Sequence, residues 1–332
     1  MEEIIKNSTK KLFDANLVIE LIKKNAPNFA NKYDLSDLKA TPIKKYIGKE
    51  FYQIVVRYDS ISLFDKPIFC TAHSKENREN AQEALEYIHK QGFKQKNAFL
   101  AKPLFFDNES RAFFYQGMDG KNLLYYIKKA NFDLTEYLEQ TAGLIAQLHE
   151  IKTDGSKNFN PQNSRIKTVV PGPEQFLLKI EKKFPKYLNK IETEFNKLVS
   201  LEEDNLKKIG QLQLIHGDFH PENIIINEKK AQFSIIDFTD ICLADWTRDI
   251  GSFLQQLRFM SSGKRSSEEI KKNQEIFLNA YLEKRSITKN SEIENRINLY
   301  KSWAALRSAI YFLIKGKPEP SNAEIVLNEI NT

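Results

Sequence analysis

A short polar loop between two apolar runs constrains this chain more than any other part of its 332 residues. The loop, His216-Gly-Asp-Phe-His-Pro-Glu-Asn223, lies between apolar residues 211–215 and 224–226, and a third apolar run, 233–236, leads directly into Asp237. Short runs rich in β-branched residues, bounded by turn residues, are typical of strands. We therefore expect three short strands whose ends bring two carboxylates, an amide and two histidines together.

These polar side chains are the groups that phosphoryl transfer requires. One carboxylate orients the attacking hydroxyl and accepts its proton, while a second carboxylate and an amide oxygen hold Mg²⁺ against the phosphates. Asp218, Asp237 and Asn223 supply this set. The alternative is that Asp218 and Asn223 are ordinary turn residues and His216 is a core histidine. Turn chemistry alone, however, does not require the whole group.

The loop and the segment Ile236-Asp-Phe-Thr-Asp240 resemble a known signature. Together they are similar to the H-G-D-x-H-x-x-N motif, followed by I-D-[FW], of the aminoglycoside phosphotransferase and choline kinase superfamily. The resemblance implies an α+β, two-lobed, protein-kinase-like fold. Its N-terminal lobe would be an antiparallel sheet and its C-terminal lobe would be mainly helical.

The resemblance also implies roles for the residues of the loop. Asp218 would be the catalytic base, and Asn223 and Asp237 would be the ligands of Mg²⁺. His216 and His220 would support the loop.

Two further segments extend the resemblance along the C-terminal lobe. Ala244-Asp-Trp-Thr-Arg-Asp249 resembles the family's G-D-P-x-x-D, which implies a structural role for Asp249, although the glycine and the proline are absent. Leu144-Ile-Ala-Gln-Leu-His149 resembles the family's L-A-x-L-H helix, in which His149 is structural.

The nucleotide side of the resemblance is weaker. Phe114-Tyr-Gln-Gly-Met-Asp-Gly120 resembles the interlobe hinge, which implies that the backbone of Gln116 and Met118 bonds the adenine edge of ATP. The nucleotide loop, residues 44–49, has a single glycine, Gly48.

The third strand departs from the kinase-like pattern, which places there a lysine that holds the α- and β-phosphates and pairs with a glutamate of the helix. Residues 67–73 contain no lysine, and Thr71 lies near its expected position. We expect a substitute that points into the nucleotide site, with three candidate cations and two candidate partners: Arg57, Lys66 or Lys75, with Glu79 or Glu83.

The rest of the chain divides into a strand-rich part, 1–115, and a helical part, 116–332. In the first part the residue pattern predicts strands at 43–47, 51–58, 67–71, 99–106 and 112–115, and helices at 15–25 and 76–91. In the second part it predicts helices at 134–149, along the apolar stripe 176–198, and at 245–261, 267–283 and 290–313.

Composition excludes several classes of protein. The net charge of +6 is spread along the chain, which is unlike a nucleic-acid-binding protein. The first residues lack the order of a signal peptide, and residues 303–314 are too short to cross a bilayer. Cys70 and Cys242 have no metal-binding spacing, so we expect buried free thiols. We expect a cytoplasmic monomer or homodimer without nucleic-acid or membrane partners.

The sequence therefore predicts an ATP- and Mg²⁺-dependent phosphotransferase acting on a hydroxyl of a small molecule that is aminoglycoside-, amino-alcohol- or sugar-like. A kinase-like nucleotide-binding protein with weak or no activity is the alternative, because the strand lysine is missing. A protein kinase fits less well, since H-G-D replaces H-R-D and no A-P-E follows. Asp240 and Asp245 could begin an acidic wall for a polycation. Trp246 and Trp303 could cage a quaternary ammonium, although tryptophans are more often core residues.

Overall fold

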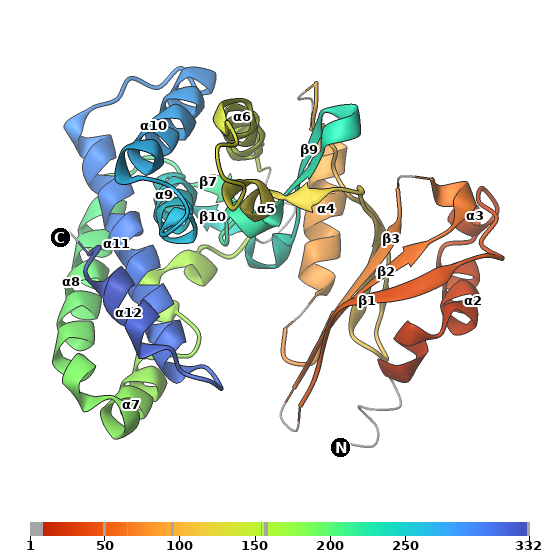
Figure 1. The fold of residues 1–332 in the computed structure, drawn as a ribbon, viewed down its shortest axis with the longest axis horizontal. Coiled ribbons are helices and arrows are strands. Elements are labelled where there is room, and N and C mark those ends of the chain that lie inside the picture. The colour runs from red at the N-terminus through yellow and green to blue at the C-terminus, as the bar shows by residue number, and fades with distance from the viewer. Residues whose placement is uncertain are drawn as a thin grey trace. The chain divides into compact units, whose positions relative to one another are not determined.

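The chain forms two compact units (Figure 1). The computed structural model describes residues 9–48, 51–64, 66–76, 78–93, 96–153, 155 and 159–330. The first unit is the part of the chain up to Lys121 together with Ile225–Thr239, and the second is Asn122–Ile224 together with the part from Asp240 onward. Compared with the expected division at residue 115, a later segment of the chain returns to the first unit.

A five-stranded antiparallel sheet forms the centre of the first unit, in the order β1-β2-β3-β5-β4. Its helices and strands are α2 (Ala15–Asn25), α3 (Pro27–Ala30), β1 (Lys39–Ile47), β2 (Tyr52–Asp59), β3 (Ile68–His73), α4 (Glu79–Gln91), β4 (Lys102–Asp107) and β5 (Ala112–Gln116). The predicted sheet with one inserted helix is confirmed. The first and fourth strands both differ in extent from the prediction, since β1 begins at Lys39 and β4 begins at Lys102.

One face of this sheet packs against α2 and α3. Because side chains alternate between the faces of a strand, Ile54 and Val56 of β2 lie on the same buried face as Cys70 of β3. Val18 and Ile22 of α2 belong to the same apolar cluster. Figure 1 shows α2 and α3 on one side of the sheet and α4 on the other.

The opposite face of the sheet looks toward α4 and carries the intervening residues. Val55, Thr71, Phe113 and Tyr115 lie on this face and line a cavity together with residues of α4. The remaining wall comes from the returning segment, in which β8 (Ile224–Asn227) and β9 (Gln232–Ile235) form a three-stranded sheet with β6 (Lys121–Asn122). This segment also contributes Ile235, Ile236, Asp237 and Phe238 to the cavity.

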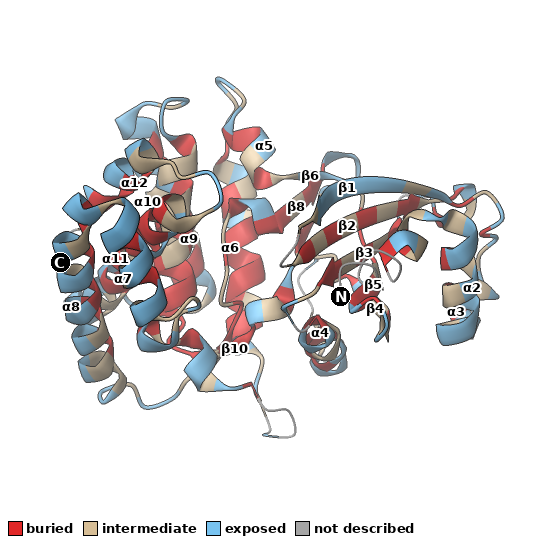
Figure 2. Ribbon diagram, turned by 90° about the horizontal axis from the view of Figure 1, so that it is seen from below, coloured by how far each residue is buried: buried red, intermediate tan, exposed pale blue. Residues whose placement is uncertain are grey.

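The second unit is mainly helical, with one short pair of strands. Its helices and strands are α5 (Leu123–Ile127), α6 (Thr135–Glu150), α7 (Pro173–Lys183), α8 (Leu188–Leu206), β7 (Gln213–Ile215), β10 (Cys242–Ala244), α9 (Thr247–Ser261), α10 (Ser267–Lys284), α11 (Ser291–Ile314) and α12 (Pro320–Leu327). The predicted helices at 134–149, 245–261, 267–283 and 290–313 are confirmed to within two residues at each end. In Figure 2, α6 is buried along most of its length, whereas α8 has an exposed side.

The apolar stripe at 176–198 belongs to two helices instead of one. Pro185 has no N–H group for an α-helical hydrogen bond, and the chain passes through a short 3₁₀ turn, Pro185–Tyr187, between α7 and α8. The stripe is part of the core, because Phe176, Ile191 and Phe195 are buried in one cluster with residues of α11.

The two cysteines confirm the expectation of buried free thiols. Burial raises the pKa of Cys242 to about 12, so this thiol is not ionised at neutral pH. Cys70 is buried in the core of the sheet. None of the helices in the described part of the chain combines the length and apolar content needed to cross a bilayer.

Gly251 lets α9 approach α11 closely. A Cβ atom at this position would lie 2.7 Å from the carbonyl oxygen of Ile297 and 2.8 Å from the Cβ of Tyr300. Both contacts are shorter than packed carbon atoms tolerate, and one of them involves backbone that cannot rotate away. The separation of the two helices therefore depends on glycine.

We predict that Gly251→Ala destabilises the second unit by about 1–3 kcal/mol through overpacking. Both tryptophans, Trp246 and Trp303, belong to that unit, so tryptophan fluorescence during urea unfolding reports on it selectively. Gly316→Ala is the matched control, because nothing lies within 4 Å of its added Cβ. Equal unfolding midpoints for the two variants would contradict the close approach.

Candidate active site

The polar loop, residues 216–223, leaves the short strand β7. This strand pairs antiparallel with β10, and Ile215 lies opposite Cys242. The last residues of the loop form a 3₁₀ turn, Pro221–Asn223, which leads into β8. The loop and β10 belong to the second unit, whereas Asp237 belongs to the first.

Gly217 is required by the shape of the loop. Its φ of +84° lies in the region that side chains with a Cβ atom rarely adopt. A Cβ atom here would also lie 2.2 Å from the carbonyl oxygen of Asp240. Glycine is therefore required at this position of the H-G-D motif, because any other side chain would clash with the backbone of Asp240.

The buried carboxylate of Asp249 fixes the start of the loop. It lies in the first turn of α9 and is 1% exposed. Its Oδ2 accepts the backbone N–H of His216 at 2.7 Å, and its Oδ1 accepts that of Gly217 at 3.0 Å. Two backbone donors that the loop would otherwise leave unsatisfied are thus paired with one charged acceptor. This gives Asp249 the structural role that the motif implied.

His149, at the end of α6, completes the network around Asp249. Its Nε2 lies 3.1 Å from Asp249 Oδ2, and its Nδ1 lies 2.7 Å from the hydroxyl oxygen of Tyr281. Burial lowers the pKa of His149 even though the Asp249 carboxylate acts in the opposite direction. A neutral ring that donates from Nε2 to the carboxylate accepts at Nδ1 from the Tyr281 hydroxyl. The structural role expected for His149 is therefore to link α6 and α10 to α9.

Asp218 carries the expected catalytic carboxylate and lies between two basic side chains. His220 Nε2 lies 3.4 Å from its Oδ2, and the Arg307 guanidinium lies 3.3 Å from its Oδ1. Burial alone would raise the pKa of Asp218. The hydrogen bond from His220 and the positive charge of Arg307 outweigh burial and hold the pKa well below its usual value. Asp218 is therefore ionised at neutral pH.

The two histidines of the loop act on its backbone. His216 is fully buried, and its Nδ1 accepts the N–H of Asp218 at 3.3 Å. The Nδ1 of His220 accepts the N–H of Glu222 at 3.3 Å, which caps the 3₁₀ turn and leaves Nε2 to face Asp218. These contacts are those of residues that support the loop.

Asn223 is held in one orientation by the same loop. Its side-chain N–H donates to the carbonyl oxygen of Asp218 at 2.9 Å. Because the amide nitrogen donates this hydrogen bond, the amide oxygen points away from the carbonyl and can accept a hydrogen bond or bind a metal.

Asp237 follows β9 in the first unit and has an unusual backbone. Its φ is +65°, a left-handed conformation that aspartate adopts more readily than most residues but at some energetic cost. Its Oδ1 accepts hydrogen bonds from Thr239 at 2.6 Å and from Arg78 at 2.8 Å. Among the described residues, its Oδ2 has no partner, and the side chain is 43% exposed. One oxygen is thus anchored and the other is open.

Arg78, just before α4, is a functional candidate that the sequence reasoning missed. Its side chain is 8% exposed and forms ion pairs with Asp237 at 2.8 Å and with Glu76 at 2.5 Å. It also lines the cavity on the α4 face of the sheet, which has a volume of about 110 Å³. The three candidates from the sequence lie on the second strand (Arg57) and on either side of the third strand (Lys66 and Lys75). The feature of the sequence that could have identified Arg78 is its position at the start of the predicted helix 76–91.

The three expected substitute cations do not line this cavity. Arg57 forms ion pairs with Asp59 at 2.8 Å and Asp119 at 2.6 Å. The ammonium groups of the other two lie over aromatic rings, Lys66 over Phe99 and Lys75 over Phe51.

The residues expected at the adenine lie around the end of β5 and the first hairpin. Gln116 is the last residue of β5, and buried Met118 follows in the connection to β6. Gly48 follows β1, and its N–H donates to the carbonyl oxygen of Phe51 at 2.9 Å. The two residues between Gly48 and Phe51 lie outside the described part of the chain.

Two ideas about the acceptor side need correction. Asp245 cannot begin an acidic wall, because it is 2% exposed, accepts the N–H of Thr247 at the start of α9, and faces Arg296 at 3.7 Å. Trp246 and Trp303 are buried, so neither forms an open aromatic cage. Trp246 stacks on Tyr281, and Trp303 packs in the core with α8.

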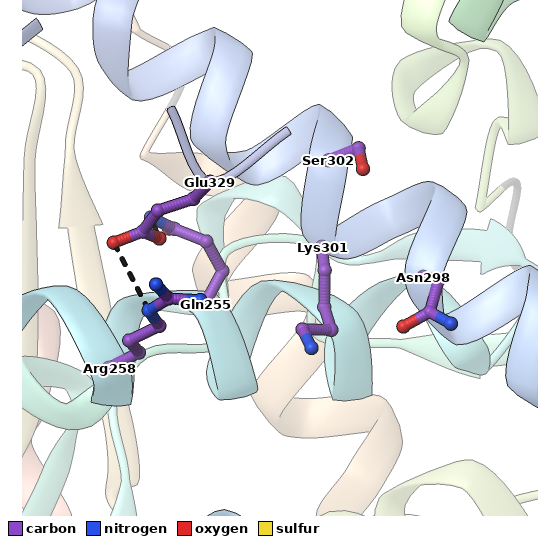
Figure 3. A pocket seen from close by; sticks show the side chains of 6 residues that line it. All are labelled: Gln255, Arg258, Asn298, Lys301, Ser302 and Glu329. Carbon is purple, nitrogen blue, oxygen red and sulfur yellow. Dashed lines mark hydrogen bonds and ion pairs between the residues drawn. The ribbon is translucent and has the colours of Figure 1, made fainter. Parts of the chain in front are cut away.

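A second cavity in the helical unit is too small for an acceptor. It lies among α9, α11 and Glu329, where Arg258 and Glu329 form an ion pair at 3.4 Å (Figure 3). Its volume of about 30 Å³ leaves room for about two water molecules.

We predict that Asp249→Asn destabilises the second unit by about 3–5 kcal/mol, because the amide brings a donor against two backbone donors and removes the charge that pairs them. Urea unfolding measures this change. Faster amide hydrogen exchange in the peptide 214–219 would locate it in the polar loop. Asp204→Asn is the control, since its ion pair with Lys207 is exposed and contributes little to stability. An unchanged exchange rate would show that Asp249 does not hold the loop.

Known structures share this fold. The ethanolamine kinase of Plasmodium vivax is 16% identical with a TM-score of 0.63, over 99% of this chain and 94% of that chain. The choline kinase of Cryptosporidium parvum Iowa II is 13% identical with a TM-score of 0.66, over 96% and 94%. A spectinomycin phosphotransferase is 16% identical with a TM-score of 0.53, over 95% and 93%. The expected α+β, protein-kinase-like fold is therefore confirmed.

The sequence itself matches a family model. A comparison with curated proteins gave no match. The model of the phosphotransferase enzyme family, however, matches residues 66–281, which is well over half of the chain and includes both the polar loop and Asp237. The chain belongs to the phosphotransferase enzyme family.

Proposed function

We propose that this protein transfers the terminal phosphoryl group of ATP to a hydroxyl group of a small molecule, with Mg²⁺ as the cofactor. One observation carries the proposal. The polar loop holds an ionised Asp218 next to an oriented Asn223 amide, and the first unit holds Asp237 with one open carboxylate oxygen. Oxygen donors of these kinds are what phosphoryl transfer requires.

The chemistry of the donor set fits a magnesium ion. Mg²⁺ prefers oxygen ligands and usually takes only one or two carboxylates from the protein. Asp237 offers Oδ2 and Asn223 offers its amide oxygen, because the other polar atom of each side chain is already hydrogen-bonded. When bound with ATP, the metal would neutralise charge on the phosphate oxygens.

Asp218 would act on the acceptor hydroxyl. In the proposed reaction the hydroxyl oxygen bonds to the terminal phosphorus of ATP, the bond from that phosphorus to the leaving diphosphate breaks, and Asp218 takes the hydroxyl proton. The lowered pKa keeps Asp218 ionised, so the carboxylate can orient the hydroxyl and accept its proton as the bond to phosphorus forms. Its contacts with His220 and Arg307 keep the carboxylate in place for this role.

Arg307 favours a neutral or singly charged acceptor over a polycationic one. Its guanidinium already occupies the position beside Asp218 that a cationic group of the substrate would seek. The buried Asp245 removes one of the two acidic residues that could have attracted a polycation. A sugar-like or amino-alcohol acceptor therefore fits the charges around Asp218 better than an aminoglycoside.

We expect a coupled assay of ADP release to show ATP turnover with at least one compound in a panel of sugars, amino alcohols, nucleosides and aminoglycosides. The panel includes ethanolamine, choline and spectinomycin, after the names of the structural relatives. Asp218→Asn controls for contaminating activity. ATP binding without transfer to any acceptor would instead support the inactive alternative, and transfer only to proteins would support a protein kinase.

Substitution of the two carboxylates should change ATP binding and turnover in different ways. Asp218→Asn is expected to keep Mg-ATP affinity and to lower kcat by roughly 10²- to 10⁴-fold, as for a lost general base. Asp237→Asn is expected to weaken Mg²⁺-dependent ATP binding as well as turnover, because asparagine tolerates the left-handed backbone but lacks the charge. Asn223→Ala should resemble the second variant in a milder form.

A Mg²⁺ titration of ATP binding and turnover for each variant makes the comparison, with Asp204→Asn as the surface control. Equal losses of metal affinity for Asp218→Asn and Asp237→Asn would show that the roles are assigned wrongly. Normal turnover in both Asp218→Asn and Asp237→Asn would also show that the roles are assigned wrongly.

A further inference from the structure

The cavity of the first unit contains a buried cation whose partners leave it incompletely satisfied. The Nη1 of Arg78 donates to Asp237 Oδ1 and to the Thr239 hydroxyl, each at 2.8 Å, and its Nη2 donates to Glu76 at 2.5 Å. Its Nε is buried and has no hydrogen-bond partner among the described residues. A buried guanidinium donor without a partner costs free energy unless a ligand supplies an acceptor.

Among the described residues, the strands contribute no cation to the lining of this cavity. Arg57 of β2 lies on the same face of the sheet as Val55, but it does not line the cavity and pairs with Asp59 and Asp119. Thr71 of β3 lies opposite Val55 of β2 and Phe113 of β5, and all three line the cavity. Thr71 thus stands on the face from which a strand lysine would reach phosphates, but its side chain is too short and uncharged. Of the described residues that line the cavity, Arg78 is the only one with a positive charge.

We propose that Arg78 binds the phosphate oxygens of the nucleotide and replaces the strand lysine of kinase-like folds. The cation then comes from the start of α4 instead of from β3, and its carboxylate partner is Glu76. This inference rests on the proposed use of ATP, and it assigns the phosphate contact to a residue outside the three candidates that the sequence suggested.

The geometry also gives Arg78 an effect on Asp237. Arg78 and Thr239 both bond to Oδ1 of this carboxylate, which leaves Oδ2 as the open oxygen. A fixed carboxylate presents that oxygen in one direction, and the left-handed backbone of Asp237 shows that the surrounding contacts hold a costly conformation. Arg78 therefore binds the phosphates and positions the proposed metal ligand from one side chain.

The competing role for Arg78 is inhibitory: its ion pair with Asp237 would act as a latch that keeps the carboxylate from a metal ion and so hinders nucleotide binding. The two roles predict opposite effects of removing the guanidinium. An anchor strengthens binding of every ligand with phosphates and has no effect on a ligand without them. A latch weakens binding, so its removal tightens it.

Isothermal titration calorimetry with ATP, ADP and adenosine tests the proposal on the full-length protein. Arg78→Gln is expected to weaken ATP and ADP binding by about 10- to 100-fold, as for the loss of hydrogen bonds to a charged group, and to leave adenosine affinity unchanged. Arg78→Lys keeps the charge but not the fork of donors, so its loss should be smaller. Adenosine binding shows that each variant is folded, and Arg78→Lys serves if Arg78→Gln does not fold.

Arg111→Gln is the matched control, because this exposed arginine of the same unit lies outside the cavity lining and makes one long hydrogen bond, of 3.4 Å, to the backbone of Glu76. ATP affinity in Arg78→Gln that equals or exceeds that of the wild type would overturn the anchor. An equal loss for adenosine would overturn it too, because the effect would then be structural. A wild-type protein that binds no ATP would refute the proposed function itself.

Discussion

The arrangement of the polar loop depends on one buried carboxylate. Asp249 accepts two backbone N–H groups of the loop and a histidine N–H, and it lies at the start of α9, where the helix dipole favours negative charge. The same helix is held at close distance to α11 by Gly251, two residues further along. The position of Asp218 is therefore set by helix packing, through a charge that never needs to touch a substrate. The backbone of the loop that carries Asp218 is therefore tied to a helix by two hydrogen bonds to one charged acceptor.

Each unit holds one carboxylate of the candidate site in place, but the neighbouring side chains that hold it differ. In the second unit, histidines and an arginine surround Asp218 and keep it ionised. In the first unit, Arg78 and Thr239 take one oxygen of Asp237 and leave the other open. In both cases a carboxylate is fixed by neighbours that satisfy part of its hydrogen-bonding capacity. The remaining hydrogen-bonding capacity of each carboxylate is what the proposed function assigns to the substrate or the metal.

Helices and strands were predicted correctly from the sequence where a short run of neighbouring residues determines them. The β-branched runs predicted β2, β5 and the three short strands around the polar loop, and the helical spacing predicted α9 to α11. The exposure of Asp245 was predicted wrongly, because its burial depends on Arg296, which is distant in sequence. Arg78 was missed for the same reason: its partner Asp237 follows it by 159 residues. The break between α7 and α8 was readable from Pro185, but the continuous apolar stripe outweighed it.

The return of Ile225–Thr239 to the first unit has a consequence for synthesis on the ribosome. About 100 residues separate Lys121 from this segment, and at roughly 5–20 residues per second that stretch takes several seconds to make. During this time the sheet has emerged, but the cavity face lacks Ile235, Ile236 and Phe238, and Arg78 lacks Asp237. The first unit is thus first in the chain but cannot be completed until much of the second has been translated. Until residue 239 has left the exit tunnel, a nascent chain of this length exposes the apolar residues that this segment covers in the folded protein.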